Sequence, residues 1–245
     1  MSAITDLIEM SKSYIGYVEK KSNRYLDDFT ANAGLENYTK FARDYKKYTG
    51  IDVQGQPWCD VFVDMMFIYT FGVQNAKKML GGFSAYTPQS AQYFKNIGRY
   101  FKTPVIGDVI FFKNSERIYH TGIVYAVDAE NVYTVEGNTS SGKGVVENGG
   151  CVAKKSYSLN YNKIDGYGRP LWDIIPERKE VIEMANKVND IKGHYAEKHI
   201  EKLIECGIVN GYEDGTFRPD APITRGQAAV MVANALQYLG KIKIK

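Results

Sequence analysis

Cys59 is one of three cysteines in this chain of 245 residues, and its position could make the thiol reactive. It follows Pro57 and Trp58 and precedes a long apolar run, so the sequence places it in the first turn of a predicted helix. Unpaired N–H groups and the positive end of the helix dipole stabilise a thiolate there, and the thiolate is the nucleophilic form of cysteine. Taken alone, Cys59 also fits a small buried residue at a helix start.

A cysteine nucleophile needs a general base, and His120 is the only histidine in residues 1–188. It lies in a predicted strand, where alternation places His120, Gly122 and Val124 on one face. A cysteine at a helix start followed by a histidine on a later strand is the chain order of papain-like enzymes. We therefore expect Cys59 and His120 to form a catalytic pair.

The base in turn needs a partner that fixes its tautomer, and the next predicted strand carries two candidates, Glu136 and Asn138. They are two residues apart, so alternation predicts that both point to one face. An antiparallel strand beside His120 would let either side chain accept the imidazole N–H. The sequence leaves the choice between them open.

An oxyanion formed during acyl transfer needs hydrogen-bond donors, and one is expected to be the backbone N–H of Cys59. The side-chain amide of Gln56 or Gln54 is a candidate for the second donor, although an ordinary polar loop position explains each equally well. Trp58 either lines the substrate groove or packs against the sheet.

Helical patterns come first along the chain and strand patterns follow, which favours an α+β fold with an antiparallel sheet. The predicted strands alternate and are separated by turn residues, whereas the earlier segments carry the 3.6-residue period. Helices are predicted over residues 3–20, 37–48, 58–69 (ending near Gly72) and 88–98, and strands over 107–113, 119–128, 131–138, 149–159 and 166–172.

The motifs PWCDVFV, GDVIFF, YHTGIVYAV, YTVEGNTS and GYGRP occur in this order. Together they resemble the CHAP family, the cysteine, histidine-dependent amidohydrolases and peptidases that cut peptidoglycan, and especially the CHAP domains of phage and prophage endolysins. The resemblance covers residues 3–172 and implies a papain-like fold. It assigns Cys59 as the nucleophile, His120 as the general base, and Glu136 and Asn138 as the groups that orient and support His120.

The resemblance leaves the need for a metal open, because some CHAP domains bind calcium through several acids just before the nucleophile. This chain has only Asp52 there, and calcium requires several oxygen ligands, so we expect no metal and no other cofactor. A zinc site is also not expected, because the cysteines are widely spaced and the chain has three histidines.

The segment after residue 188 contains HYAEKHI, GIVNGYEDGTFRPD and ITRGQAA, and it resembles an S-layer homology (SLH) module. The resemblance implies a small all-α unit that binds secondary cell-wall polymers, with Arg225 and Tyr195 as candidate contacts. Tyr195 stands where the family usually has Trp, and Gly226–Gln227 where it usually has Ala-Glu. SLH modules usually occur in threes, so this one either binds alone or assembles from three chains; we expect a monomer.

These segments predict a CHAP domain over residues 1–172, a linker over 173–188 and an SLH module over 189–245. A net charge of +3 without a basic run indicates no nucleic-acid partner, and no apolar stretch approaches the length of a membrane span. The N-terminus lacks the pattern of a signal peptide. We therefore expect an endolysin that is made in the cytoplasm and acts on peptidoglycan at a Gram-positive wall after release. A host autolysin and a non-catalytic wall-binding protein are the alternatives.

Overall fold

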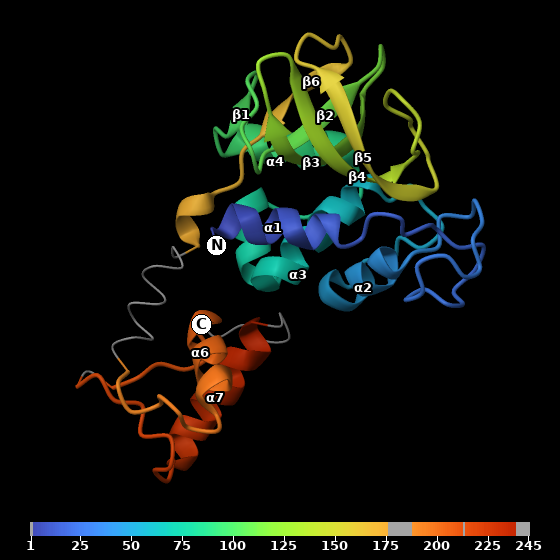
Figure 1. Ribbon diagram of the computed structural model, residues 1–245. Helices are drawn as coiled ribbons and strands as arrows, with labels where there is room; N and C mark the ends of the chain where they lie inside the picture. Colours follow the sequence, from blue (N-terminus) through green and yellow to red (C-terminus); the bar gives the residue numbers. More distant parts are fainter. Residues whose placement is uncertain (1, 176–187, 213, 239–245) are drawn as a thin grey trace.

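The computed structural model describes residues 2–175, 188–212 and 214–238 of the chain. Residues 2–175 form a layer of helices against an antiparallel sheet, and residues 188–238 contribute two further helices (Figure 1). The fold class predicted from the sequence for the first part, α+β with an antiparallel sheet, is confirmed. Among the described residues, no helix is both long enough and apolar enough to cross a membrane.

The first two helices are shorter than their sequence patterns indicate. Helix α1 ends at Lys12 instead of residue 20, because the chain turns at Gly16 (φ 90°) and Val18 then pairs with Cys151. Helix α2 begins three residues later than predicted, because the Thr39 side chain accepts the Ala42 N–H and so caps the helix. The helices of this layer are α1 (Ala3–Lys12), α2 (Lys40–Thr49), α3 (Cys59–Leu80) and α4 (Thr87–Asn96).

Helix α3 is the centre of the domain, and it contacts α1, α2, α4 and two strands of the sheet. Its apolar residues are buried around most of its circumference, which explains the long apolar run in the sequence. The sequence predicts an end near Gly72, and the regular helical conformation is interrupted there: Gly72 adopts φ 74° and ψ 160°. A second helical segment follows this kink directly, so α3 as a whole extends to Leu80.

The sheet has the strand order β1-β6-β2-β3-β4-β5, and neighbouring strands are antiparallel. Short strand β1 has no counterpart in the predicted set, and the last strand ends at Gly168 because Trp172 begins a 3-10 helix, η1 (Trp172–Ile174). The strands are β1 (Tyr100–Phe101), β2 (Val109–Lys113), β3 (Ile118–Val127), β4 (Asn131–Thr139), β5 (Cys151–Ser158) and β6 (Ile164–Gly168).

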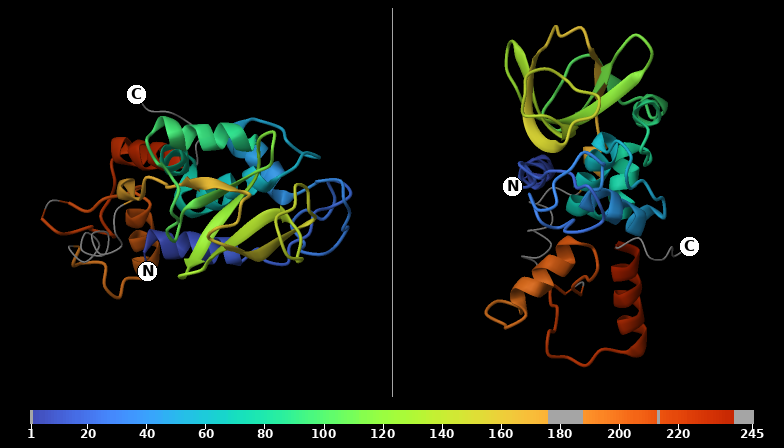
Figure 2. Two further views of the ribbon diagram at one scale, coloured as in Figure 1. Left: turned by 90° about the horizontal axis from the view of Figure 1, so that it is seen from above. Right: turned by 90° about the vertical axis from the view of Figure 1, so that its right-hand side faces the viewer.

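The two faces of the sheet pack into two separate cores. One face packs against α3 and contributes Phe111, Ile123 and Val135 to the main core. The other face curls around a smaller core that includes Phe112 and Tyr157, so the helical layer covers only one side (Figure 2). The strand residues therefore alternate between two apolar environments instead of between core and solvent.

Residues 188–238 have a small core of their own, formed by aliphatic side chains around Ile200 and Ile204. Helices α6 (Glu197–Glu205) and α7 (Arg225–Tyr238) are joined by a long loop. At the start of α7 the Thr224 side chain accepts the Gln227 N–H, and the Gln227 side chain accepts the Thr224 N–H. This is a capping box, so Gln227 retains one structural role of the Glu that is usual in the family.

The domain boundaries predicted from the sequence are not tested as such. Residues 173 and 174 of the predicted linker belong to η1, and its residues 176–187 lie outside the described part of the chain. The all-α character of the C-terminal unit stays a prediction, because residues 213 and 239–245 also lie outside the described part.

Candidate active site

Cys59 is the first residue of α3, as the sequence predicts, and its side chain is only 4% exposed. Trp58 occupies the N-cap position with φ −122° and ψ 17°, and its side chain makes no capping bond. The first N–H groups of a helix have no acceptor within the helix. The Cys59 N–H is therefore a suitable hydrogen-bond donor to the oxyanion that forms on a substrate carbonyl when the thiol attacks it.

His120 from β3 and Glu136 from β4 meet in a fully buried hydrogen bond, with 2.9 Å between Nε2 and Oε2. Strands β3 and β4 are antiparallel neighbours, as predicted, so the two side chains reach each other across one face of the sheet. A Cβ at Gly122 would lie 2.5 Å from the Glu136 Cγ. The glycine therefore provides the space in which the Glu136 side chain crosses β3.

The Glu136 carboxylate is held by three further donors. The Thr134 hydroxyl donates to Oε1 at 2.6 Å, and the hydroxyls of Thr139 and Tyr157 donate to Oε2 at 3.3 and 3.2 Å. Each donor is buried. A carboxylate with this many donors keeps its orientation, so it can fix both the tautomer and the ring position of His120.

The other ring nitrogen of His120, Nδ1, is buried without a hydrogen-bond partner in the described part of the chain. Burial lowers the pKa of His120, but interactions with Cys59 and Glu136 outweigh burial and raise it to about 10. The raised pKa favours an imidazolium between the thiol and the carboxylate. A protonated imidazole beside a thiol is the arrangement that activates a cysteine nucleophile.

Asn138 does not bond to His120, although alternation predicts that it shares the face of Glu136. The register of β4 against β5 slips by one residue between Glu136 and Thr139, which is a β-bulge. Asn138 adopts φ 53° in this bulge, and its carboxamide is buried with no partner in the residues described. Alternation fails across the bulge, so of the two predicted partners it is Glu136 that hydrogen-bonds to the imidazole.

Trp58 is fully buried and lies against β4, so of the two alternatives given for it the structure supports packing against the sheet and not a place in the substrate groove. Its ring stacks on Phe41 with 5.6 Å between ring centroids, and its Nε1 donates to the Glu19 carboxylate at 2.8 Å. The physical reason is the aromatic core beneath the start of α3, which also contains Tyr17 and Phe62. No signal in the sequence distinguishes this position from an exposed one.

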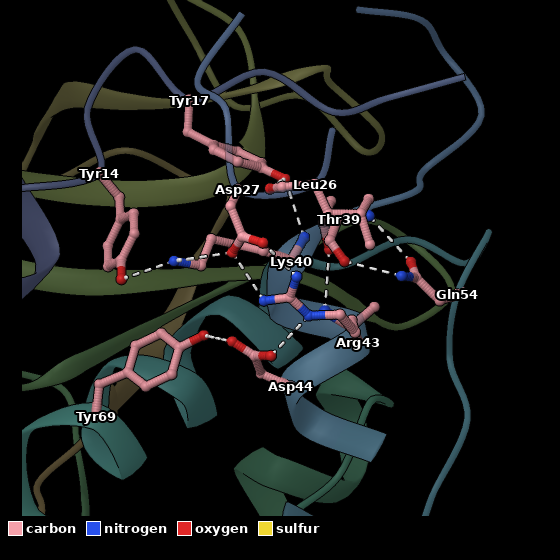
Figure 3. A network of polar contacts seen from close by, with 11 residues as sticks. Tyr14, Tyr17, Leu26, Asp27, Thr39, Lys40, Arg43, Asp44, Gln54 and Tyr69 are labelled. Carbon is pink, nitrogen blue, oxygen red and sulfur yellow. Dashed lines mark hydrogen bonds and ion pairs between the residues drawn. The ribbon is translucent and has the colours of Figure 1, made fainter. Parts of the chain in front are cut away.

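The two glutamines before the nucleophile have different surroundings. The Gln54 side chain accepts the Thr39 N–H and donates to the Thr39 carbonyl, each at 2.9 Å (Figure 3). Gln54 therefore fastens the start of α2 and is not free to bind an oxyanion. Gln56 is exposed, and it remains the glutamine predicted as the second donor.

No metal centre is formed by the residues described: they contain no cluster of three or more His, Cys, Asp or Glu side chains that could hold an ion. Asp52, the acid that most closely precedes the nucleophile in the sequence, pairs instead with Lys46 at 2.6 Å on the surface. The absence of a bound metal stays a prediction.

The candidate polymer-binding residues of the C-terminal unit are both exposed. Tyr195 is 89% exposed beside the His194 ring, with 4.4 Å between the ring centroids. Arg225 is exposed at the start of α7. Their accessibility suits contact with a polymer, and their roles stay predictions.

Comparison with protein families indicates a hydrolase of the amidase or peptidase kind for the domain that carries Cys59, His120 and Glu136. The model of the CHAP domain matches residues 51–138, which include all four predicted catalytic positions. The model of the S-layer homology domain matches residues 189–229. The chain therefore carries a CHAP domain followed by an SLH domain.

Similar curated proteins match over short segments. They include a cellulosome-anchoring protein of Acetivibrio thermocellus, 38% identical over 55 residues (22% of this chain, 12% of the relative). Cell surface glycoprotein 1 of the same organism is 38% identical over 64 residues, or 26% and 3% of the two chains. Outer membrane protein SlpA of Deinococcus radiodurans is 40% identical over 47 residues, or 19% and 4%. The chain thus spans a small fraction of these relatives, and no solved structure matches it.

Proposed function

We propose that the protein is a peptidoglycan hydrolase that cuts an amide bond through Cys59 and is held at the cell wall by its SLH domain. The observation that carries this proposal is the buried His120–Glu136 hydrogen bond, which leaves Nδ1 of His120 for the thiol at the start of α3. The CHAP match supports hydrolysis of the amidase or peptidase kind. The proposal needs neither metal nor cofactor, because the thiolate is itself the nucleophile.

In the proposed reaction, the Cys59 thiolate attacks the carbonyl carbon of the scissile amide, and the carbonyl oxygen becomes an oxyanion near the Cys59 N–H. The His120 imidazolium gives its proton to the leaving nitrogen as the C–N bond breaks, which leaves a thioester. Neutral His120 then removes a proton from water, the resulting hydroxide adds to the thioester, and the C–S bond breaks. A carboxylic acid leaves, and the thiolate–imidazolium pair is restored.

The wall anchor is the second part of the proposal. The SLH match, together with relatives named as an anchoring protein and a cell-surface glycoprotein, supports binding to a secondary cell-wall polymer. We place Arg225 and Tyr195 in that contact because both are exposed. The finer interpretation, an endolysin of phage origin, rests on the sequence resemblance of residues 3–172. A holin gene beside the coding sequence would support it.

Mass spectrometry of purified walls digested with the full-length protein tests the reaction directly. Cleavage by an N-acetylmuramoyl-L-alanine amidase separates the glycan from the stem peptide and exposes the amine of L-alanine. Cleavage by an endopeptidase leaves the stem peptide on the glycan and exposes an amine within a stem or cross-bridge. Release of reducing sugars without either kind of new amine would contradict the proposal.

A further inference from the structure

A buried carboxylate lies behind the start of α3, and the reaction described above does not use it. Glu19 is 2% exposed and lies in the segment between α1 and α2. Its Oε2 accepts the indole N–H of Trp58 at 2.8 Å, and Trp58 is the residue directly before Cys59. Burial raises the pKa of Glu19, although its hydrogen bond to Trp58 opposes that rise.

Trp58 connects the start of α3 to the strand that carries the histidine's partner. A Cβ at Gly137 would lie 2.8 Å from the Trp58 Cζ3 and 2.5 Å from the Phe62 Cβ, so β4 passes against the indole without a side chain between them. Gly137 directly follows Glu136. A rotation of the indole would therefore change the distance between the start of α3 and β4.

Glu19 is itself fixed by its backbone. Its N–H donates to the Gly150 carbonyl at 2.9 Å, next to the first residue of β5, and its carbonyl accepts the Gly34 N–H at 3.1 Å. The carboxylate therefore links the edge of the sheet to the indole. Trp58 makes no capping bond for α3, so this link restrains the start of the helix together with the Ser90 hydroxyl, which donates to Asp60 at 2.7 Å.

Stability alone does not explain a buried carboxylate at this position. Burying a carboxylate is unfavourable, and an apolar side chain of similar size would fill the same space without that cost. A strong, directional acceptor is useful where a neighbouring group must be held to within a fraction of an ångström. Cys59 is such a group, because its thiol must face His120.

We propose that Glu19 is a positioning residue, which holds Trp58 and through it the Cys59 thiol in place against His120. The proposal rests on the proposed function for its catalytic consequence. Its geometric content, the alignment of the thiol with the imidazole, can be measured without any wall substrate. The two ideas can therefore fail separately.

The test compares Glu19→Leu, which removes the acceptor, with Glu19→Gln, which keeps an acceptor in the same place. Both are made in full-length protein carrying Cys151→Ala and Cys206→Ala, so that Cys59 is the only thiol. Glu116→Gln, at an exposed surface position, is the control. The measurements are the pH profile of Cys59 alkylation by iodoacetamide, kcat and KM on soluble peptidoglycan, and the unfolding midpoint.

We expect Glu19→Leu to slow alkylation at neutral pH and to lower kcat by roughly 10- to 100-fold, the size of effect that misplacement by about 1 Å produces, with little change in KM. Glu19→Gln should recover most of the loss, and the control should behave as the unsubstituted background. If no variant cuts walls, the pH profile of alkylation still shows whether Glu19 positions the Cys59 thiol.

Trp58→Phe tests the same link from the other side, because it removes the indole N–H and keeps an aromatic ring in the core. It should reproduce the slowed alkylation, and adding Glu19→Gln to it should have no further effect. The proposal is overturned if a folded Glu19→Leu protein, or Trp58→Phe where Glu19→Leu does not fold, keeps the background alkylation profile and kcat. A lower unfolding midpoint alone would show that the bond is only structural.

Discussion

His120 lies between a carboxylate and a thiol, and this position governs when the imidazole carries a proton. Burial alone would favour the neutral ring, and the contacts with Cys59 and Glu136 reverse that preference. In the proposed reaction the imidazolium is therefore present when the thiolate attacks, and it gives its proton to the leaving nitrogen. Cys59 and His120 therefore act as a unit, so the loss of either residue should stop the reaction.

Replacement of the nucleophile is the first prediction at this scale. Cys59→Ala should lower turnover on peptidoglycan by about a thousandfold or more, because the covalent route disappears, and His120→Ala should be about as damaging. Cys151→Ala is the matched control, because this residue is partly exposed and its thiol donates to the Thr139 carbonyl, away from the His120 ring. Turnover should be measured by release of new amines. Wild-type turnover in Cys59→Ala would contradict the mechanism.

The pH dependence gives the second prediction. The pKa of His120 is raised from 6.5 to about 10, so the basic limb of the kcat/KM profile should lie near pH 10. Glu136→Gln should shift that limb to lower pH, because it removes one of the two interactions that raise the pKa. The stability that these contacts supply should be complete below pH 6.5 and be lost as the pH rises through about 10.

Thermal unfolding followed against pH checks the second half of that prediction. The unfolding midpoint of the wild-type protein should fall between pH 6.5 and 10, and the fall should be shallower in Glu136→Gln. An unchanged basic limb in Glu136→Gln would remove Glu136 from the site. Equal slopes for the two proteins would contradict the proposed coupling.

At the scale of elements, two glycines let the strands bring the site together. Gly122 leaves room for the Glu136 side chain, and Gly137 lets β4 pass close to the first turn of α3. The bulge that follows turns Asn138 into a left-handed conformation. These features belong to the backbone, so their consequences for catalysis arise from geometry and not from charge.

Gly122→Ala should therefore impair catalysis more than it impairs folding. Its Cβ would lie 2.5 Å from the Glu136 Cγ, so the carboxylate would have to leave its place beside His120. The control is Gly142→Ala, where the nearest atom is 3.6 Å away and the backbone has no positive φ. The measurements are kcat and the unfolding midpoint, and wild-type kcat in Gly122→Ala would show that Glu136 can be accommodated elsewhere.

Asn138→Gly and Asn138→Ala separate the side chain of Asn138 from its backbone. Glycine adopts φ 53° freely, whereas alanine there costs about 1–2 kcal/mol. Asn138→Gly should therefore keep the wild-type unfolding midpoint, with a milder loss of turnover than His120→Ala, because Glu136 already occupies Nε2. A loss in Asn138→Gly as large as in His120→Ala would give the carboxamide an essential role.

Much of the arrangement of these helices and strands can be predicted from the sequence. The prediction fails where the backbone departs from the regular alternation of a strand. The start of α3 at Cys59 follows from the break at Pro57 before a long apolar run, and the face of His120 and the pairing of β3 with β4 follow from alternation and a short turn. The bulge near Asn138 does not, because alternation carries no sign of an extra residue. The burial of Trp58 also could not be predicted, since an aromatic residue before a helix suits a groove as well as a core.

At the scale of the whole molecule, the C-terminal unit contacts the catalytic domain away from the nucleophile. Helix α7 packs against α3, where the Tyr238 carbonyl oxygen would be 3.0 Å from a Cβ at Gly72. Gly72 is about four helical turns from Cys59, or roughly 20 Å along the axis. The C-terminal unit thus contacts α3 far from Cys59, so we expect that wall attachment and hydrolysis can be altered separately.

A truncated chain of residues 2–175 should test this separation. It should end at Ile175 and not earlier, because Trp172 packs against Phe67 and Phe71, and Ile175 packs against the main core. On soluble peptidoglycan fragments it should match the full-length rate, because it retains every proposed catalytic residue. On intact walls it should be slower, because a tether raises the local concentration of enzyme near its substrate.

The last prediction concerns the polymer contact itself. Arg225→Ala in the full-length protein should reproduce the loss on intact walls and leave the rate on soluble fragments unchanged, because a guanidinium at the start of α7 suits the acidic groups of a wall polymer. Lys198→Ala removes another exposed cation of the same unit and serves as the control. Sedimentation should show a monomer of 27.6 kDa, whereas a species of three chains would mean that the polymer site is assembled between modules. A truncated chain that binds and clears intact walls as well as the full-length protein would show that the SLH domain is not the anchor.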